Sequence, residues 1–219
     1  MSETDSFINE VSEEVRKDKL FKLFRKYGWI PVVLIVLIVG GATFNEVRNA
    51  RAEAAAQAAG DAVLEALNQE DPTARAASLA ALDRDGEPGR AAVLGFLEAA
   101  SEAEAGNVDG AVAILDGIAD DAGAGAIYRD LATLKSVILG AESTDPADRI
   151  ARLDAIAVPN APFRLLAIEQ IALAQVEQGN TDAALDTLRE LLGEGGVTQG
   201  LRQRAQQLIV SLGGTLAVL

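Results

Sequence analysis

The residues best suited to chemistry in this chain are paired carboxylates, because the sequence contains neither histidine nor cysteine. Asp120 and Asp121 are adjacent, and Asp83 and Asp85 flank Arg84. Paired carboxylates can bind a cation or share acid–base work, but neither pair has the spacing of a calcium loop or of an octahedral ligand set. Both pairs stand where helices are expected to end, so we interpret them as solvated loop acids.

One glycine-rich run, Gly193-Glu194-Gly195-Gly196, has the composition of a phosphate-binding loop. No strand is expected before it and no Lys-Ser/Thr pair follows it, so a phosphate site is not predicted. The missing histidine and cysteine also remove the commonest general base, the best thiolate nucleophile and the usual zinc ligands. We therefore expect no catalysis, no metal or other cofactor and no small-molecule substrate.

The chain is acidic, with 219 residues and a formal net charge of −14. Acidic and basic residues are equal in number within residues 1–28, so the excess belongs to residues 29–219. Binding to nucleic acid requires a dense basic patch and is not expected. The length allows one membrane span and one domain with a proper core.

The segment from Trp29 to Phe44 contains no charged side chain. A spanning helix needs about 20 apolar residues, and the small and apolar residues on both sides extend this segment to roughly that length. Pro31 falls in the first turn of such a helix, where its missing N–H costs no hydrogen bond. The sequence therefore predicts one transmembrane helix over residues 29–50.

Basic residues mark the orientation of this helix. Six of them precede the segment within residues 16–26, and only Arg48 and Arg51 follow it closely. The positive-inside rule places the basic side in the cytoplasm. We expect a cytoplasmic segment over residues 1–28 and a domain on the other side of the membrane over residues 51–219. Phe7, Ile8, Val11 and Val15 predict an amphipathic helix before the span, which rests on anionic lipid or docks a cytoplasmic partner.

Two alternatives concern the small residues near the end of the span. Gly40-Gly41-Ala42 could be the cleavage site of a signal peptide, although the long, charged front segment does not resemble the start of one. A mature chain that begins near Thr43 would support cleavage. In an uncleaved anchor, Gly40 and Gly41 either allow another helix to approach closely or simply precede the exit from the membrane.

The soluble part repeats itself. Gly106-Asn107-Val108-Asp109-Gly110-Ala111 matches Gly179-Asn180-Thr181-Asp182-Ala183-Ala184, and in both copies a leucine follows the aspartate by six residues. Glycine can adopt the left-handed conformation that ends a helix, and the aspartate can cap the next helix. The alanine at the end of the motif, Ala111 or Ala184, allows two antiparallel helices to pack closely. The copies are separated by about two 34-residue units and a small insertion.

This spacing resembles that of tetratricopeptide arrays. We expect one helix over residues 45–68, a short helix over 73–82, helix pairs over 89–119, 124–157 and 161–193, and a capping helix over 198–212. The aromatic bulk typical of the repeat is mostly missing, since only Phe96, Tyr128 and Phe163 supply it. The predicted fold class is all-α, with one N-terminal transmembrane helix followed by a tetratricopeptide-like helix-hairpin solenoid.

The order of these parts resembles the bacterial YfgM-like family over nearly the whole chain. The resemblance lies in the acidic segment that begins at Asp5, the run from Lys22 to Trp29, the single span and the acidic helical array. It implies an inner-membrane protein with a periplasmic tetratricopeptide domain that is ancillary to the SecYEG translocon and connects it to periplasmic chaperones or secreted clients. A scaffold for a respiratory or other inner-membrane complex is the alternative.

Overall fold

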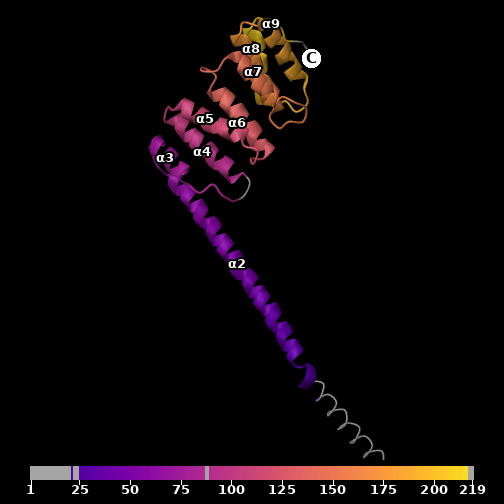
Figure 1. Cartoon of the computed structure of the whole chain (residues 1–219). Helices are drawn as coiled ribbons and strands as arrows, with labels where there is room; N and C mark the ends of the chain where they lie inside the picture. Colours follow the sequence, from indigo (N-terminus) through magenta and orange to yellow (C-terminus); the bar gives the residue numbers. More distant parts are fainter. Residues whose placement is uncertain (1–20, 22–24, 87–88, 217–219) are drawn as a thin grey trace, which may run out of the picture. The chain divides into compact units, whose positions relative to one another are not determined.

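The structure, a computed structural model, describes residues 21, 25–86 and 89–216 (Figure 1). Within these ranges the regular secondary structure is entirely α-helical, and no residue is assigned to a strand. The chain divides into two compact units, residues 1–61 and residues 62–219. The predicted all-α fold class is confirmed. The amphipathic helix predicted from Phe7 to Val15 lies outside the described residues.

The long helix α2 (Trp29–Leu67) begins directly after a turn at Gly28. It contains 39 residues, so it is about 58 Å long. Its large apolar side chains from Val33 to Val39 are exposed, and within the described ranges α2 is the one helix whose length and composition would allow it to cross a membrane. The helix predicted over residues 45–68 is thus the continuation of the helix that contains the predicted span.

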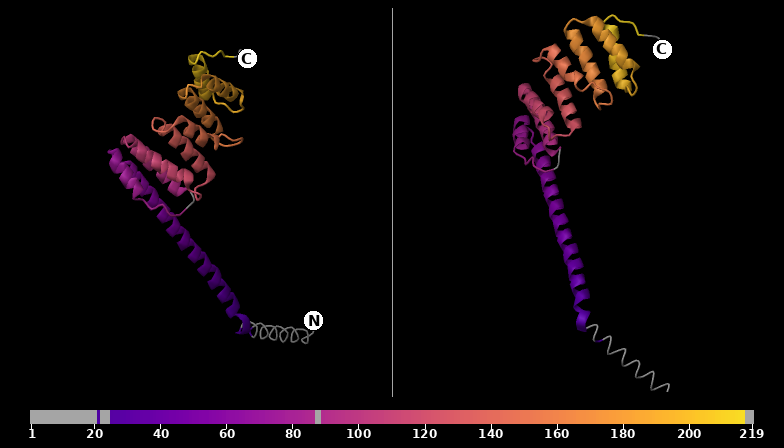
Figure 2. Two further views of the ribbon diagram at one scale, coloured as in Figure 1. Left: turned by 45° about the horizontal axis from the view of Figure 1, so that its top comes forward. Right: turned by 45° about the vertical axis from the view of Figure 1, so that its right-hand side comes forward.

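The second unit is a series of shorter helices that pack on their neighbours (Figures 1 and 2). They are α3 (Pro72–Ala80), α4 (Arg90–Glu104), α5 (Val108–Asp120), α6 (Ala126–Leu139), α7 (Pro146–Asp154), α8 (Arg164–Glu177), α9 (Thr181–Gly193) and α10 (Gln199–Ser211). The pairs α4/α5, α6/α7 and α8/α9 match the three predicted helix pairs, and α10 matches the predicted last helix. We call this series the array.

Two helices of the array start in the same way. Asp71 and Asp145 each accept a hydrogen bond from the backbone N–H two residues later, at 3.2 and 2.8 Å, and each is followed by proline. Aspartate satisfies one of the free amides of the first turn, while proline at the first helical position has no N–H to satisfy. The two Asp-Pro dipeptides therefore fix where α3 and α7 begin.

The core of the array consists of several small clusters placed along the series of helices. The largest lies at its C-terminal end and joins α8, α9 and α10 through Ile168, Leu188 and Ile209, among others. A second cluster joins α6, α7 and α8 through side chains that include Val137 and Leu153. Because each helix buries its apolar face against its neighbours, the stability of each region depends on the helices beside it.

Polar contacts also link successive helices. Arg149 of α7 is buried and pairs with Glu177 of α8. Asp116 of α5 accepts hydrogen bonds from Ser136 of α6 and from Arg152 of α7. Ser136 is fully buried, so this contact satisfies a hydroxyl group that would otherwise destabilise the fold. The three helices α5, α6 and α7 are thus held together by a shared polar contact as well as by apolar packing.

Candidate functional site

The predicted repeat turns have the same backbone geometry in both copies. Gly106 and Gly179 have φ angles of +84° and +76°, the left-handed conformation that favours glycine. In each copy the amide of the next residue donates to the carbonyl five residues back, at 2.9 Å. The glycine amide donates to the carbonyl three residues back, at 3.0 and 2.9 Å. Both turns are therefore Schellman motifs, which satisfy the last carbonyls of α4 and α8.

A third turn of this kind ends α10. Gly213 has a φ of +80°, and Gly213 and Gly214 donate to the carbonyls three and five residues back, at 3.0 and 2.9 Å. Gly213 follows Gly179 by about 34 residues, one tetratricopeptide unit. Sequence reasoning did not find this turn because glycine replaces the asparagine of the other two copies. The shared turn indicates that α10 occupies the position of a first helix of a further pair.

The structure corrects the predicted helix cap. We expected the aspartates of the motif to cap the second helices, but the cap positions belong to Asn107 and Asn180. The Asn107 side chain accepts a hydrogen bond from the amide of Gly110 at 3.2 Å. Asp109 and Asp182 lie within the first turns of α5 and α9, where their negative charge interacts favourably with the positive end of the helix dipole.

The repeated alanine and leucine of the motif are core residues. Ala111, Ala184 and Leu188 are completely buried, and Leu115 is only 1% exposed. Ala111 packs with Leu115 and Ala99 in one cluster between α4 and α5. An alanine at this position leaves room for the neighbouring helix, and the leucine supplies the apolar area. The motif residues therefore set the packing of each pair, and they present no chemistry of their own.

The turn geometry predicts opposite effects for two glycine substitutions. Gly179→Ala should lower the free energy of unfolding by about 1 kcal/mol, because alanine resists a positive φ. Gly117→Ala should raise it by about 0.5–1 kcal/mol, since Gly117 lies inside α5 and an added Cβ would meet no atom within 4 Å. Urea denaturation of both variants tests this, and a change of the same sign in both would contradict the assignment of the turn.

The carboxylate pairs serve the turns in which they lie. Asp83 accepts a hydrogen bond from the amide of Asp85 at 3.0 Å, and Asp121 accepts one from the amide of Gly123 at 2.8 Å. Asp120 is the last residue of α5 and is exposed. Within the described ranges no three His, Cys, Asp or Glu side chains are grouped as a metal site would require.

The glycine-rich run is a helix-ending turn. Glu194 is the C-cap residue of α9, and its carboxylate pairs with Arg164 of α8 at 2.7 Å. The hydrogen bond from Arg164, together with the opposite charge, holds the pKa of Glu194 below its ordinary value despite a partial loss of water around it. The stabilisation from this pair is present above the ordinary glutamate pKa and is lost as the pH falls through the lowered pKa.

One apolar cavity opens on the face formed by the first helices of the array. It has a volume of about 660 Å³ and lies between α6, α8 and α10. Leu134, Leu188 and Ala205 are its buried apolar residues, while Ile138 and Leu173 are exposed at its rim. We call this cavity the groove. Cavities of about 300–1,000 Å³ with mainly apolar linings are typical binding sites.

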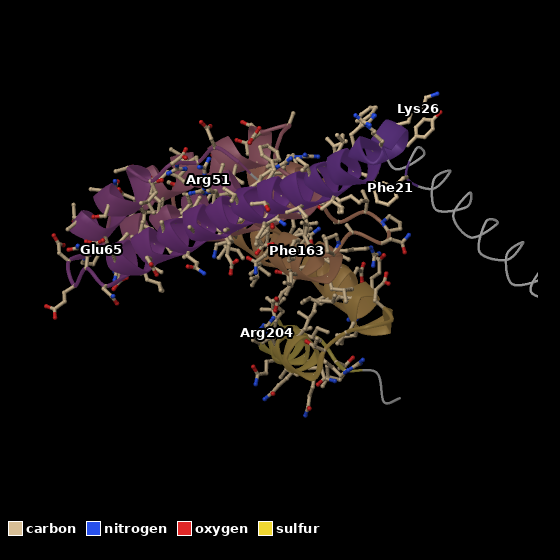
Figure 3. The ribbon with its side chains drawn as sticks, turned by 90° about the horizontal axis from the view of Figure 1, so that it is seen from below. Phe21, Lys26, Arg51, Glu65, Phe163 and Arg204 are labelled. Atoms are coloured by element: carbon tan, nitrogen blue, oxygen red, sulfur yellow. The ribbon has the colours of Figure 1, made fainter. Side chains whose placement is uncertain are left out.

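An ion pair crosses the groove between two helices. Arg204 of α10 holds both carboxylate oxygens of Glu169 of α8, with Nε–Oε1 and Nη2–Oε2 distances of 2.7 and 2.8 Å. Glu169 is only 7% exposed, whereas the Arg204 side chain is half-exposed. Figure 3 labels Arg204 in the C-terminal part of the array. The hydrogen bonds and the charge of Glu169 raise the pKa of Arg204. The pair thus links α10 to α8 within the lining of the groove.

Sequence reasoning did not identify the groove residues. A signal was present in α8, where Leu165, Leu166, Ile168, Ile171 and Leu173 place apolar side chains on more than one face of the helix. A helix at a single interface needs only one apolar stripe. The additional apolar side chains, Leu166 and Leu173, line the groove.

The residues predicted for the span all lie in or at the start of α2. Trp29 is its first residue, Pro31 falls in the first turn, and Gly40 and Gly41 lie in its interior. A Cβ added at Gly40 or at Gly41 would meet no atom within 4 Å. The glycines are therefore not required by any packing within the described part of the chain, so larger side chains fit there.

The stacked helix pairs and their repeated turns define a helical-repeat protein of the protein-interaction class. The Tetratricopeptide repeat-like domain family matches residues 23–157, more than half of the chain, and the chain belongs to that family. No curated protein and no solved structure matches it. The turn at Gly179 lies beyond the matched residues and has the same geometry as the turn at Gly106, so the array continues past the matched part.

Proposed function

We propose that the protein is a membrane-anchored adaptor whose array holds segments of partner proteins. The observation that carries this proposal is the presence, in one chain, of a helix with exposed apolar side chains from Val33 to Val39 and an interaction array with an open apolar groove. Such a helix gains stability when lipid covers it, and the groove gains stability when a partner covers it. Non-enzymatic binding accounts for both features.

The proposed location is a bacterial inner membrane with a single span. The N-terminal segment, residues 1–28, would be cytoplasmic, residues 29–50 would cross the membrane, and residues 51–219 would be periplasmic. The basic residues before the span, compared with only Arg48 and Arg51 after it, support this orientation. An acidic, cysteine-free domain is compatible with an oxidising compartment.

The proposed partners are the SecYEG translocon and the periplasmic chaperones or secreted clients that meet it. The resemblance to the YfgM-like family supports this choice, as does the tetratricopeptide-like array, whose family serves protein–protein interaction. A protein tethered beside the translocon is placed to meet emerging chains before they fold. The alternative role is that of a scaffold for a respiratory complex. Recovery of only an assembled respiratory complex in cross-linking experiments would favour it.

Exchange of the span tests whether the anchor itself recognises a partner. If the span recognises a partner helix, Gly40→Leu together with Gly41→Leu should abolish co-purification with the translocon and leave membrane insertion intact, because the leucines fit α2 itself but keep another helix at a distance. Affinity purification from solubilised membranes, with a membrane-fraction assay as control, measures both. The matched control is Gly60→Leu, at a position of α2 outside the apolar segment that is equally open.

If a generic apolar span of equal length preserves every interaction, α2 acts only as a tether and recognition belongs to the array or to the cytoplasmic segment. If the double leucine variant retains its partners, the same conclusion holds. If the protein remains soluble when expressed with α2 intact, the anchor itself is disproved.

A further inference from the structure

The surface of the groove is apolar and only partly covered. Ile138, Leu166 and Leu173 at its rim are 48%, 38% and 36% exposed, and they come from two different first helices, α6 and α8. The residues behind them, Leu134 and Leu188, are buried. An occupant that covers the rim would remove apolar surface from water on two helices at once, which favours binding.

The charged groups at the groove are already satisfied. Arg204 makes two hydrogen bonds to Glu169 and leaves neither carboxylate oxygen without a donor. Breaking this pair to bind a charged ligand would leave Glu169, which is largely buried, without its partner, at a high cost in free energy. The remaining polar residues of the lining, Gln170, Gln207 and Ser211, are uncharged. The groove thus offers hydrogen bonds and apolar contact, and it offers no free charge.

The acidity of the chain is located elsewhere. The three helices between which the groove lies, α6, α8 and α10, carry five basic and three acidic side chains. Of these charged side chains only Arg204 and Glu169 line the groove, and they pair with each other. The second helices α5 and α9 carry an excess of acids, as do the turns. A basic partner would therefore be attracted to α5, α9 and the turns, and not to the groove.

From this lining and this distribution of charge, we infer that the groove binds an uncharged, apolar segment of a partner protein that inserts several large aliphatic or aromatic side chains. This inference rests on the proposed function, because it names the chemistry of the segment that the array holds. It distinguishes the groove from the acidic remainder of the array, whose net charge alone would suggest a basic ligand.

The absence of cysteine from the sequence allows a specific probe of the groove. Gln170→Cys introduces the only thiol of the chain into the lining, where it can carry a polarity-sensitive dye. Ala113→Cys, on an exposed position of α5, gives the matched control. Both labelled proteins are used as full chains in lipid nanodiscs. The ligand is a blocked peptide of serine and alanine with leucines at helical spacing, and two further peptides replace half of the leucines with lysine or with glutamate.

The leucine peptide should shift the dye at position 170 with a saturable, micromolar affinity and leave the dye at position 113 unchanged. The lysine and glutamate peptides should each bind at least about tenfold more weakly, because a charge would lose water without gaining a partner. Leu173→Glu should weaken binding of the leucine peptide by a similar factor. Ile127→Glu should not, because Ile127 is also an exposed apolar residue of a first helix, α6, but does not line the groove.

Tighter binding of the lysine peptide, or equal binding of all three peptides, would overturn the inference, and neither result depends on the folding of the Leu173→Glu variant. A dye shift produced by phosphatidylcholine vesicles or by raising the concentration of the protein, with no response to the peptide, would also overturn it and would identify lipid or a second copy as the occupant. Partner recovery in membranes tests the proposed function separately, so an adaptor that binds the translocon but no apolar peptide would disprove only this inference.

Discussion

Deletion of residues 198–219 should leave a protein whose array unfolds from its C-terminal end or aggregates. This deletion removes α10, whose Leu201, Ala205 and Ile209 are buried against α8 and α9. Each large apolar side chain in such a contact contributes about 1.5–3 kcal/mol, and the surface it covers becomes exposed as well. Hydrogen exchange measured by mass spectrometry on the full chain and the truncated chain should show lost protection in α8 and α9, with α4 and α5 changed little.

A chain that lacks only residues 217–219 is the control, since it retains α10. The truncation also removes Arg204, so Glu169 loses the partner that satisfies both of its oxygens. A truncated chain that remains monomeric, with unchanged protection in α8 and α9, would show that α10 does not cap the array.

Leu115→Ala and Leu188→Ala should each lower the free energy of unfolding by about 2–5 kcal/mol. The two leucines occupy equivalent positions of the repeat, and both are at least 99% buried. Truncation to alanine removes the apolar contact and leaves a cavity that the surrounding helices fill only in part. Because stability in a repeat array is transmitted between neighbours, each loss should be largest in its own helix pair.

Leu64→Ala provides the matched control, because Leu64 is a helical leucine that is 60% exposed. Its substitution should change stability by less than about 0.5 kcal/mol. Urea denaturation gives the overall change, and hydrogen exchange gives its location. If one leucine variant is strongly destabilised and the other is not, the two copies of the motif are not structurally equivalent.

The helix pairs were predictable from sequence because their turn chemistry is local. The Gly-Asn-x-Asp-x-Ala motif supplies a left-handed glycine and a small buried alanine in both copies, and in the first copy Asn107 also caps the next helix through its side chain. The Asp-Pro dipeptides at Asp71 and Asp145 are equally local. The prediction failed in choosing between two candidate caps that lie two residues apart, since asparagine and aspartate are almost equally good at that position.

The groove was not predictable because it depends on helices that are far apart in sequence. Arg204 and Glu169 lie on α10 and α8, and nothing in either segment shows that they pair. The same holds for Asp116 and Arg152, which meet only because α5 and α7 both pack beside α6. Local patterns can show that a helix has extra apolar residues, but they do not show which neighbour covers them and which are left open.

Photo-crosslinking in intact membranes shows which surface of the array meets a partner. A photoreactive residue is placed at Gln170 in the groove of the full-length protein, and in a second protein at Ala113 on α5. We predict that the residue in the groove cross-links to SecY or to secreted chains that emerge beside it, and that the control residue does so much less. Recovery of only an assembled respiratory complex from Gln170, or equal recovery of every partner from both positions, would contradict the account of a translocon adaptor that binds its partners through the groove.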